Sequence, residues 1–156
     1  MLQKKCYTGE RVQKKGGGPL QQWITKSAAE TEALGETLAK ELHAGDVLAL
    51  FGGMGMGKTA FVRGVARGLH LSAEVSSPTF ALVHDYGGNP PLVHFDMYRI
   101  SGWEDLYTTG YFDYLDAGAI LVVEWSENIE NALPANAIRL RFSAPDADDT
   151  RIIERF

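Results

Sequence analysis

The sequence has little cysteine and no long apolar run. Cys6, its only cysteine, cannot form a disulfide within one chain or a zinc site built from several thiolates. No apolar segment approaches the roughly 20 residues of a membrane-spanning helix, and residues 1–15 lack the apolar core of a secretory signal. These absences exclude a disulfide scaffold and a membrane-spanning protein, and we expect a cytoplasmic protein without membrane contact.

Two signatures of nucleotide-binding families are also absent. The N-K-x-D pattern, with which GTPases read guanine, does not occur, and neither does the L-S-G-G-Q segment of ABC-type ATPases. Asp85–Gly88 fits the D-x-x-G pattern of GTPases only superficially, because it falls at a predicted hairpin turn. These absences exclude a GTPase and an ABC-type ATPase.

Charge is distributed unevenly along the 156 residues. Residues 1–22 hold five basic residues and one acidic residue, Glu10, which gives a net charge of +4. Because the whole sequence has a net charge of −5, residues 23–156 have a net charge of −9. We interpret 1–22 as a flexible basic leader, with an RNA contact as the alternative, and 23–156 as a single domain. An acidic body binds nucleic acid poorly, because affinity comes mostly from neutralising phosphates. We therefore expect no contact with DNA.

Alternating helix and strand patterns predict an α/β layered domain. Ser27–Glu30 has the spacing of a capping box and opens a helix with leucines at every fourth position. Val47–Phe51 is a continuous apolar run, typical of a strand buried on both faces, and an apolar stripe predicts a second helix from Lys58. The remaining expected elements are a hairpin of 80–86 and 92–98, a short helix opened by a capping box at 101–104, and strands at 119–123, 137–142 and 151–156.

A glycine-rich loop lies between the buried strand and the second helix. It matches the phosphate-binding pattern G-x-x-x-x-G-K-[ST] in full. Glycines let consecutive N–H groups converge on phosphate oxygens, and the start of the helix directs its positive end at the same anion. Lys58 supplies a charge for the β- and γ-phosphates, and the Thr59 hydroxyl is suited to bind Mg²⁺. The loop therefore predicts a nucleoside triphosphate site, formed by Gly52, Gly53, Met54, Gly55, Met56, Gly57, Lys58 and Thr59.

Mg²⁺ bound at such a loop needs a carboxylate at the end of a neighbouring strand. Glu124 follows five apolar residues, the profile of a buried parallel strand, whereas Asp96 follows the more mixed run Leu92–Phe95. A carboxylate that ends a buried strand costs solvation free energy unless a cation or hydrogen-bond donors meet it. Both residues are candidates for the site, and an ordinary surface acid is the alternative for each.

Four motifs, taken in order, resemble those of the TsaE (YjeE-type) ATPases, bacterial proteins of tRNA threonylcarbamoyladenosine synthesis. They are the glycine-rich loop, Ser77–Phe80, His94–Arg99 and Val123–Trp125. The resemblance covers residues 24–142. It implies a P-loop NTPase-type three-layer α/β sandwich with a mixed, mostly parallel central sheet. It also implies ATP and Mg²⁺ as cofactors, and a TsaD–TsaB-type protein complex as partner. With the acidic body, it implies that this protein contacts tRNA only indirectly.

The resemblance implies roles for individual residues. Thr59 and Glu124 would hold Mg²⁺, and Met54–Lys58 would wrap the phosphates. Catalysis would depend on Asp96, Lys58 and Thr79.

Three further positions bear on the nucleotide. Trp125, directly after the metal carboxylate, would respond to the nucleotide state in this family. Position 53 is usually an acid or a small polar residue in the family. Here it is Gly53, so a carboxylate that could position water is missing at this position. Thr31, on the first predicted helix, is a candidate for contact with adenine.

Other polar and aromatic residues have alternative interpretations. His84 and His94 face each other if the hairpin pairs them; we interpret them as structural, with a metal or general-base role as the alternative. Arg99 reaches a phosphate or pairs with Glu104, and we favour the pair. The aromatic residues of 103–114 predict core packing, with a docking surface as the alternative.

Three functions fit these motifs. The first is an ATPase of the tRNA-modifying machinery, slow alone and dependent on partner proteins. The second is a small-molecule kinase, and the third is a nucleotide-gated interaction module without useful turnover. Such kinases need several arginines in a lid that closes over the phosphates, yet no arginine occurs between residues 100 and 138. We therefore expect an ATPase that resets or activates the TsaD–TsaB transferase complex.

Overall fold

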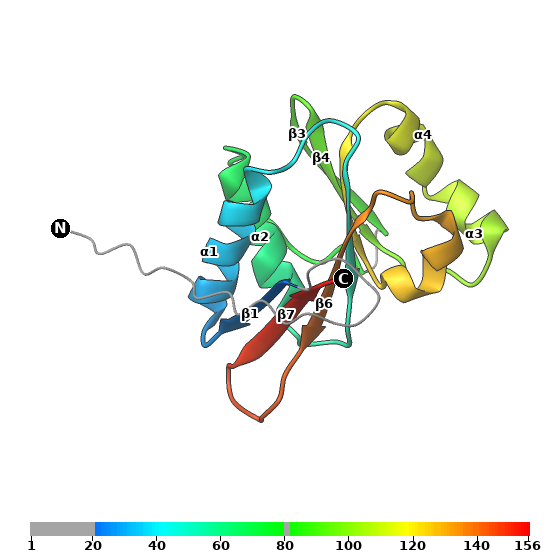
Figure 1. The fold of residues 1–156 in the computed structure, drawn as a ribbon. Helices are drawn as coiled ribbons and strands as arrows, with labels where there is room; N and C mark the ends of the chain where they lie inside the picture. Colours follow the sequence, from blue (N-terminus) through cyan, green and yellow to red (C-terminus); the bar gives the residue numbers. More distant parts are fainter. Residues whose placement is uncertain (1–20, 80–81) are drawn as a thin grey trace.

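The computed structural model describes residues 21–79 and 82–156, and one mixed sheet runs through the middle of it (Figure 1). Within these residues, seven strands lie in the order β1-β7-β6-β2-β5-β4-β3. Their bounds are Gln21–Thr25 (β1), Val47–Phe51 (β2), Val83–Gly88 (β3), Pro91–Asp96 (β4), Ile120–Glu124 (β5), Ile138–Ser143 (β6) and Arg151–Arg155 (β7).

The strand directions bring the carboxyl ends of β2, β5 and β4 to one edge of the sheet. β2 pairs in parallel with β5 and β6, and β5 pairs in parallel with β4. β1 and β6 both run antiparallel to β7, and β3 runs antiparallel to β4. Five of the seven strands in the described sheet therefore share one direction, and the expected mixed, mostly parallel sheet is confirmed.

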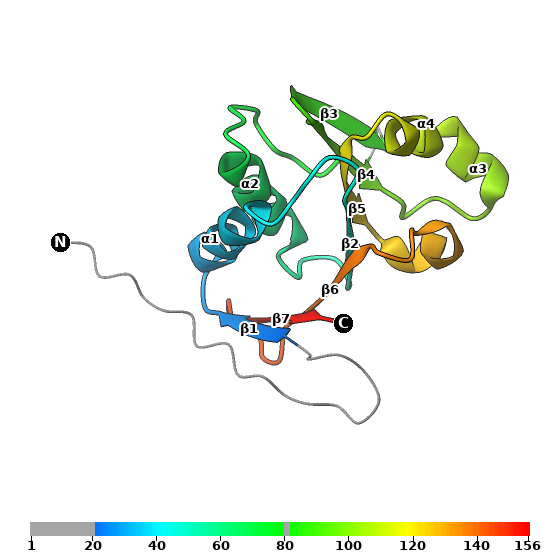
Figure 2. The same ribbon diagram turned by 45° about the horizontal axis from the view of Figure 1, so that its top comes forward.

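Helices cover both faces of the sheet and complete the three layers (Figure 2). One apolar core packs α1 and α2 against the sheet, and a second core packs α3, α4 and the 3-10 helix η1 against its other face. No helix in the described part of the chain is long and apolar enough to cross a membrane. The bounds are Ala28–Ala39 (α1), Lys58–Gly68 (α2), Trp103–Thr108 (α3), Tyr111–Asp116 (α4) and Ser126–Ala132 (η1).

The start of α1 differs slightly from the predicted capping box. The N–H of Glu30 donates to Ser27 Oγ at 3.1 Å, as predicted. The Glu30 carboxylate, however, accepts from the N–H of Lys26 at 2.8 Å, one residue before the expected donor. The side chain of Glu30 therefore fixes the turn that leads from β1 into α1.

The capping box predicted at 101–104 is wrong. Gly102 precedes α3 and provides no side-chain cap. The N–H and hydroxyl of Ser101 instead donate to the Asp105 carboxylate, at 3.0 and 2.8 Å. The helix still begins where expected, because this carboxylate holds the chain just before the first turn.

The hairpin turn is tighter than predicted. Only Asn89 and Pro90 separate β3 from β4, whereas the sequence pattern placed five residues between the strands. Phe80 and Ala81, the start of the predicted first strand, lie outside the described residues. The strand that is described begins at Val83.

The sequence patterns do not predict β1. Its residues pair antiparallel with β7, with Trp23 opposite Ile153. Of the predicted leader, residues 1–20 lie outside the described residues, and Gln21 and Gln22 belong to β1. The boundary predicted between leader and domain stays a prediction.

α1 and α2 approach so closely that a methyl group at their contact has no room. A Cβ added at Gly64 would overlap the carbonyl oxygen of Glu32. We predict that Gly64→Ala lowers the free energy of unfolding by about 1–3 kcal/mol, because the helices must separate to accept the extra group. Urea denaturation measures this loss.

Gly102→Ala is the matched control for this prediction. A Cβ at Gly102 would meet nothing within 4 Å, and its φ of −170° suits any residue. We expect its effect to stay within about 0.5 kcal/mol. A loss within about 0.5 kcal/mol for Gly64→Ala, as for the control, would show that the helix contact tolerates a methyl group.

Candidate nucleotide site

The glycine-rich loop joins the buried strand β2 to the start of α2. Gly52, Gly55 and Gly57 have φ angles of 126°, 76° and 95°, a region that residues with side chains rarely adopt. Within the described residues, the N–H groups of Gly53, Gly55 and Gly57 donate to no protein acceptor. A Cβ at Gly53 or Gly55 would meet nothing within 4 Å, so the loop borders open space. These free donors, at the start of an eleven-residue helix, fit the predicted cradle for phosphate.

Lys58, the first residue of α2, folds its side chain back onto the loop. Its Nζ donates to the carbonyl oxygens of Gly52 and Gly53, the second at 3.0 Å. The same nitrogen lies 4.7 Å from the centre of the Trp125 ring. The ammonium group is therefore held beside the loop by weak, neutral acceptors that a phosphate oxygen can replace.

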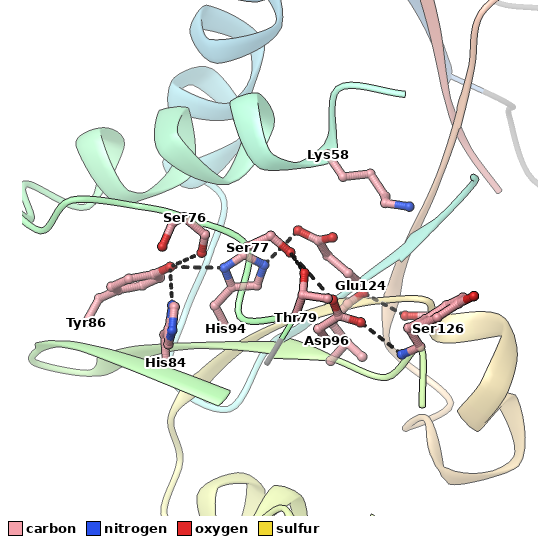
Figure 3. A network of polar contacts seen from close by, with 12 residues as sticks. Lys58, Ser76, Ser77, Thr79, His84, Tyr86, His94, Asp96, Glu124 and Ser126 are labelled. Atoms are coloured by element: carbon pink, nitrogen blue, oxygen red, sulfur yellow. Dashed lines mark hydrogen bonds and ion pairs between the residues drawn. The ribbon is translucent and has the colours of Figure 1, made fainter. Parts of the chain in front are cut away.

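Glu124 and Asp96 end neighbouring strands and lie side by side (Figure 3). Their Cα atoms pair in register between β5 and β4, and Glu124 also pairs with Leu50 on β2. The two residues are only 4% and 3% exposed, which excludes the alternative that they are surface acids. Because β5 is the strand directly beside the loop strand, Glu124 is better placed than Asp96 to hold a metal at the loop.

The oxygen donors around the loop suit Mg²⁺. This ion prefers hard oxygen ligands and is usually bound by one or two carboxylates together with substrate phosphates. The Thr59 hydroxyl and the Glu124 carboxylate are such donors, and both residues line one cavity. In the described part of the chain, no group of three His, Cys, Asp or Glu side chains forms a metal site by itself. The residues present therefore fit an ion that binds together with a polyphosphate.

The segment 76–79 brings Thr79 to the carboxylates (Figure 3). Ser77 Oγ donates to Asp96 Oδ2 at 3.5 Å and lies 3.0 Å from Thr79 Oγ1. The other Asp96 oxygen accepts the N–H of Tyr98 at 2.9 Å. Donors on both sides therefore fix the orientation of the Asp96 carboxylate.

A cavity of about 430 Å³ brings most of the predicted site residues together. Gly52 and Gly53 do not line it, but their carbonyl groups hold Lys58. Thr31 does not line it: its side chain is buried, its hydroxyl lies 2.7 Å from that of Thr25, and its methyl carbon would lie 3.7 Å from a Cβ at Gly57. A contact between Thr31 and adenine stays a prediction. The predicted residues that do line the cavity are Met54, Gly55, Met56, Gly57, Lys58, Thr59, Thr79, Asp96, Glu124 and Trp125.

Two contacts to the loop come from residues that the sequence patterns do not predict. Glu127 Oε1, on η1, accepts the N–H of Gly52 at 2.9 Å. Arg151, at the start of β7, donates from Nη2 to the carbonyl oxygen of Gly55 at 3.2 Å. The partners lie 75 and 96 residues apart in the chain, and no local pattern signals contacts over such a separation.

The motif 94–99 contributes more to the cavity than Asp96. Tyr98 and Arg99 also line it, and the ring of Tyr98 lies 4.9 Å from that of Trp125. Tyr98 could have been predicted as a site residue from the sequence, because it lies within the motif His94–Arg99. The two roles considered for Arg99 stay predictions.

The two histidines of the hairpin face each other, as the sequence suggests. His84 and His94 pair in register between β3 and β4. His84 Nδ1 and His94 Nδ1 lie 3.4 and 3.1 Å from the hydroxyl oxygen of Tyr86. Both rings therefore have hydrogen-bond partners within the protein, which agrees with the structural interpretation.

Burial lowers the pKa of Lys58 below its ordinary value of 10.5, while the charges of Glu124, Glu127 and Asp96 oppose the shift. Between the lowered value and 10.5, the unfolded chain binds a proton that the folded protein has released. The contribution of Lys58 to folding stability therefore rises with pH through this range. We predict that the free energy of unfolding of the protein, minus that of Lys58→Met, increases as the pH is raised toward 10.5.

Urea denaturation of both proteins at a series of pH values measures this difference. The comparison cancels the titration of all other groups that the substitution leaves unchanged. A difference that stays flat or falls with rising pH would show that the lysine carries no desolvation penalty.

Comparison with known proteins agrees with the fold. The family model "Threonylcarbamoyl adenosine biosynthesis protein TsaE" matches residues 25–153. The Bacillus subtilis protein named tRNA threonylcarbamoyladenosine biosynthesis protein TsaE is 36% identical to this chain over 132 residues. The match covers 83% of this chain and 82% of that protein. The one from Streptomyces coelicolor shares 42% over 118 residues, covering 74% and 80%.

The crystal structure of Bacillus subtilis YdiB is similar in fold, with a TM-score of 0.72 and 32% sequence identity. The match covers 87% of this chain and 84% of that one. Sequence and fold thus lead to one conclusion: the chain belongs to the TsaE family of tRNA threonylcarbamoyladenosine biosynthesis.

Proposed function

We propose that this protein binds ATP with Mg²⁺ and hydrolyses it as a component of tRNA threonylcarbamoyladenosine biosynthesis, where it resets or activates a TsaD–TsaB-type transferase complex. One observation carries this proposal. A single cavity is lined by the phosphate loop, by Lys58 and Thr59, and by two buried carboxylates at neighbouring strand ends.

The loop and the start of α2 bind the polyphosphate. The free N–H groups of the loop donate to phosphate oxygens, and Lys58 exchanges the carbonyl groups of Gly52 and Gly53 for the β- and γ-phosphates. Thr59 and Glu124 hold Mg²⁺, which neutralises charge that builds up on the phosphates. The Trp125 ring beside Lys58 senses whether this exchange has occurred.

Asp96 orients the attacking water and accepts its proton. The N–H of Tyr98 and the hydroxyl of Ser77 hold the two oxygens of this carboxylate, so that it is oriented before the nucleotide binds. Thr79, linked to Asp96 through Ser77, lines the same cavity and would contact the γ-phosphate. This placement favours hydrolysis over a module that only binds ATP.

The exposed surface of α3 favours a protein partner. Trp103 and Tyr107 on α3 are 53% and 65% exposed, so the docking alternative applies to part of the aromatic stretch. No lysine or arginine occurs between residues 100 and 138. Such an acidic, aromatic surface repels tRNA and suits a protein with basic residues, which agrees with a TsaD–TsaB-type partner that itself holds the tRNA. The same lack of arginine disfavours a kinase lid.

ATP turnover by the purified protein, alone and with a TsaD–TsaB pair, tests the proposal. We predict slow turnover alone and faster turnover with the pair. Lys58→Ala should bind ATP about 10- to 100-fold more weakly, because it loses charge-assisted hydrogen bonds worth about 1.5–3 kcal/mol. Binding without turnover, even with the pair, would favour the nucleotide-gated module. Phosphorylation of a small acceptor would favour the kinase, and failure to bind ATP·Mg²⁺ would refute all three functions.

The separate roles of the two carboxylates make a second prediction. Glu124→Ala should raise the Mg²⁺ concentration needed for half-maximal turnover by about tenfold or more, because it removes a metal ligand. Asp96→Ala should lower kcat by about 100-fold or more with little change in that Mg²⁺ concentration, because it removes a general base. Titrating turnover against Mg²⁺ for both variants measures this. The reverse ranking would exchange the two roles.

A further inference from the structure

The Glu124 carboxylate has a buried partner on the neighbouring strand. His94 Nε2 lies 2.8 Å from Glu124 Oε1, and the His94 side chain is fully buried (Figure 3). His94 precedes Asp96 by two residues on β4, so both side chains point to the same face of the sheet as Glu124. The proposed metal ligand is therefore held by a side chain that does not itself line the cavity.

A tyrosine hydroxyl joins the other side of the His94 ring. His94 Nδ1 lies 3.1 Å from the Tyr86 hydroxyl oxygen, which also donates to the carbonyl oxygen of Ser76 at 3.0 Å. An ionised carboxylate only accepts hydrogen bonds, so His94 presents its Nε2–H to Glu124. In a neutral ring Nδ1 is then an acceptor, and the single hydroxyl proton of Tyr86 has two acceptors at nearly equal distance. His84 Nδ1 is a third neighbour of this hydroxyl, at 3.4 Å.

This chain of contacts ends at the segment that carries Thr79. Ser76, which accepts from Tyr86, directly precedes Ser77, and Ser77 contacts both Thr79 and Asp96. Side chains of β3, β4 and β5 thus connect the Glu124 carboxylate to the segment 76–79 (Figure 3). Burial raises the pKa of the Tyr86 hydroxyl, which keeps it protonated and able to donate.

We propose that His94 is a positioning residue of the Mg²⁺ site. Its Nε2–H fixes the Glu124 carboxylate in the orientation that binds the ion, and Tyr86 links this orientation to the segment 76–79. A metal on Glu124 would restrain this carboxylate further, and with it the His94 ring, the Tyr86 hydroxyl and the Ser76 carbonyl group that the hydroxyl contacts. The inference rests on the proposed role of Glu124 in binding Mg²⁺. A histidine that only fills the core would have no such effect on metal binding.

Two substitutions separate the contacts of the His94 ring. The amide nitrogen of glutamine reaches the position of Nε2, so His94→Gln keeps a donor for Glu124. The shorter asparagine places its amide near Nδ1, so His94→Asn keeps a partner for Tyr86 and loses the contact with Glu124. Binding of Mn²⁺, used in place of Mg²⁺ and measured by EPR with saturating ADP, reports the metal site directly.

We predict that His94→Asn raises the Kd for Mn²⁺ about 10- to 100-fold, the usual effect of losing a partner of a metal ligand. His94→Gln should remain within about threefold of wild type, because its donor is kept. ADP affinity measured with EDTA, and Tm, should be alike in the two variants, since both place an amide in the same core position. His43→Asn is the control, because the side chain of this histidine is 84% exposed and should leave Mn²⁺ binding unchanged.

Equal Mn²⁺ affinity in both His94 variants, weak or strong, would overturn the inference. Wild-type protein that binds no Mn²⁺ with ADP would instead refute the proposed function. Tyr86→Phe gives an independent test if His94→Asn does not fold. It should keep Mn²⁺ binding within about threefold while the amide hydrogen exchange of residues 76–79 no longer slows when Mn²⁺ and ADP bind. Unchanged slowing in Tyr86→Phe would overturn the link to that segment.

Discussion

The buried charge of Lys58 is the constraint on which the site depends. The sheet removes two carboxylates from water at one edge, and the ammonium group lies among them and Glu127. Each of these charges would be costly to bury alone. Their attraction offsets part of this cost, although burial still outweighs it at Lys58. No buried side-chain nitrogen or oxygen in the described part of the chain lacks a hydrogen-bond partner. The charged side chains of the site are therefore already positioned, while the N–H groups of Gly53, Gly55 and Gly57 have no protein acceptor within the described residues.

Much of this arrangement could be predicted from the sequence, because local patterns determine it. A continuous apolar run determines β2, and three glycines with positive φ determine the shape of the loop that follows. The carboxylates could be named from their motifs. That Asp96 and Glu124 lie side by side depends on the order of the strands, which no local pattern encodes.

The rest depended on contacts between distant segments. β1 contains two glutamines and is only partly buried, and it forms a strand because β7 offers it an edge. Glu127 and Arg151 reach the loop only after η1 and β7 have packed. The contact between His94 and Glu124 required parallel pairing of β4 with β5. In each case the residue type was compatible with the contact, but its partner was fixed by the tertiary fold.

The position of Arg151 has a consequence for synthesis of the chain. Arg151 lies on β7, and its guanidinium group donates to the carbonyl group of Gly55. The same strand pairs with β1. Domains generally fold as units during synthesis, after the chain that they need has left the ribosome. A nascent chain that still lacks β7 has neither this contact nor the edge on which β1 pairs. The phosphate loop therefore acquires its final support only after residues 151–155 have emerged.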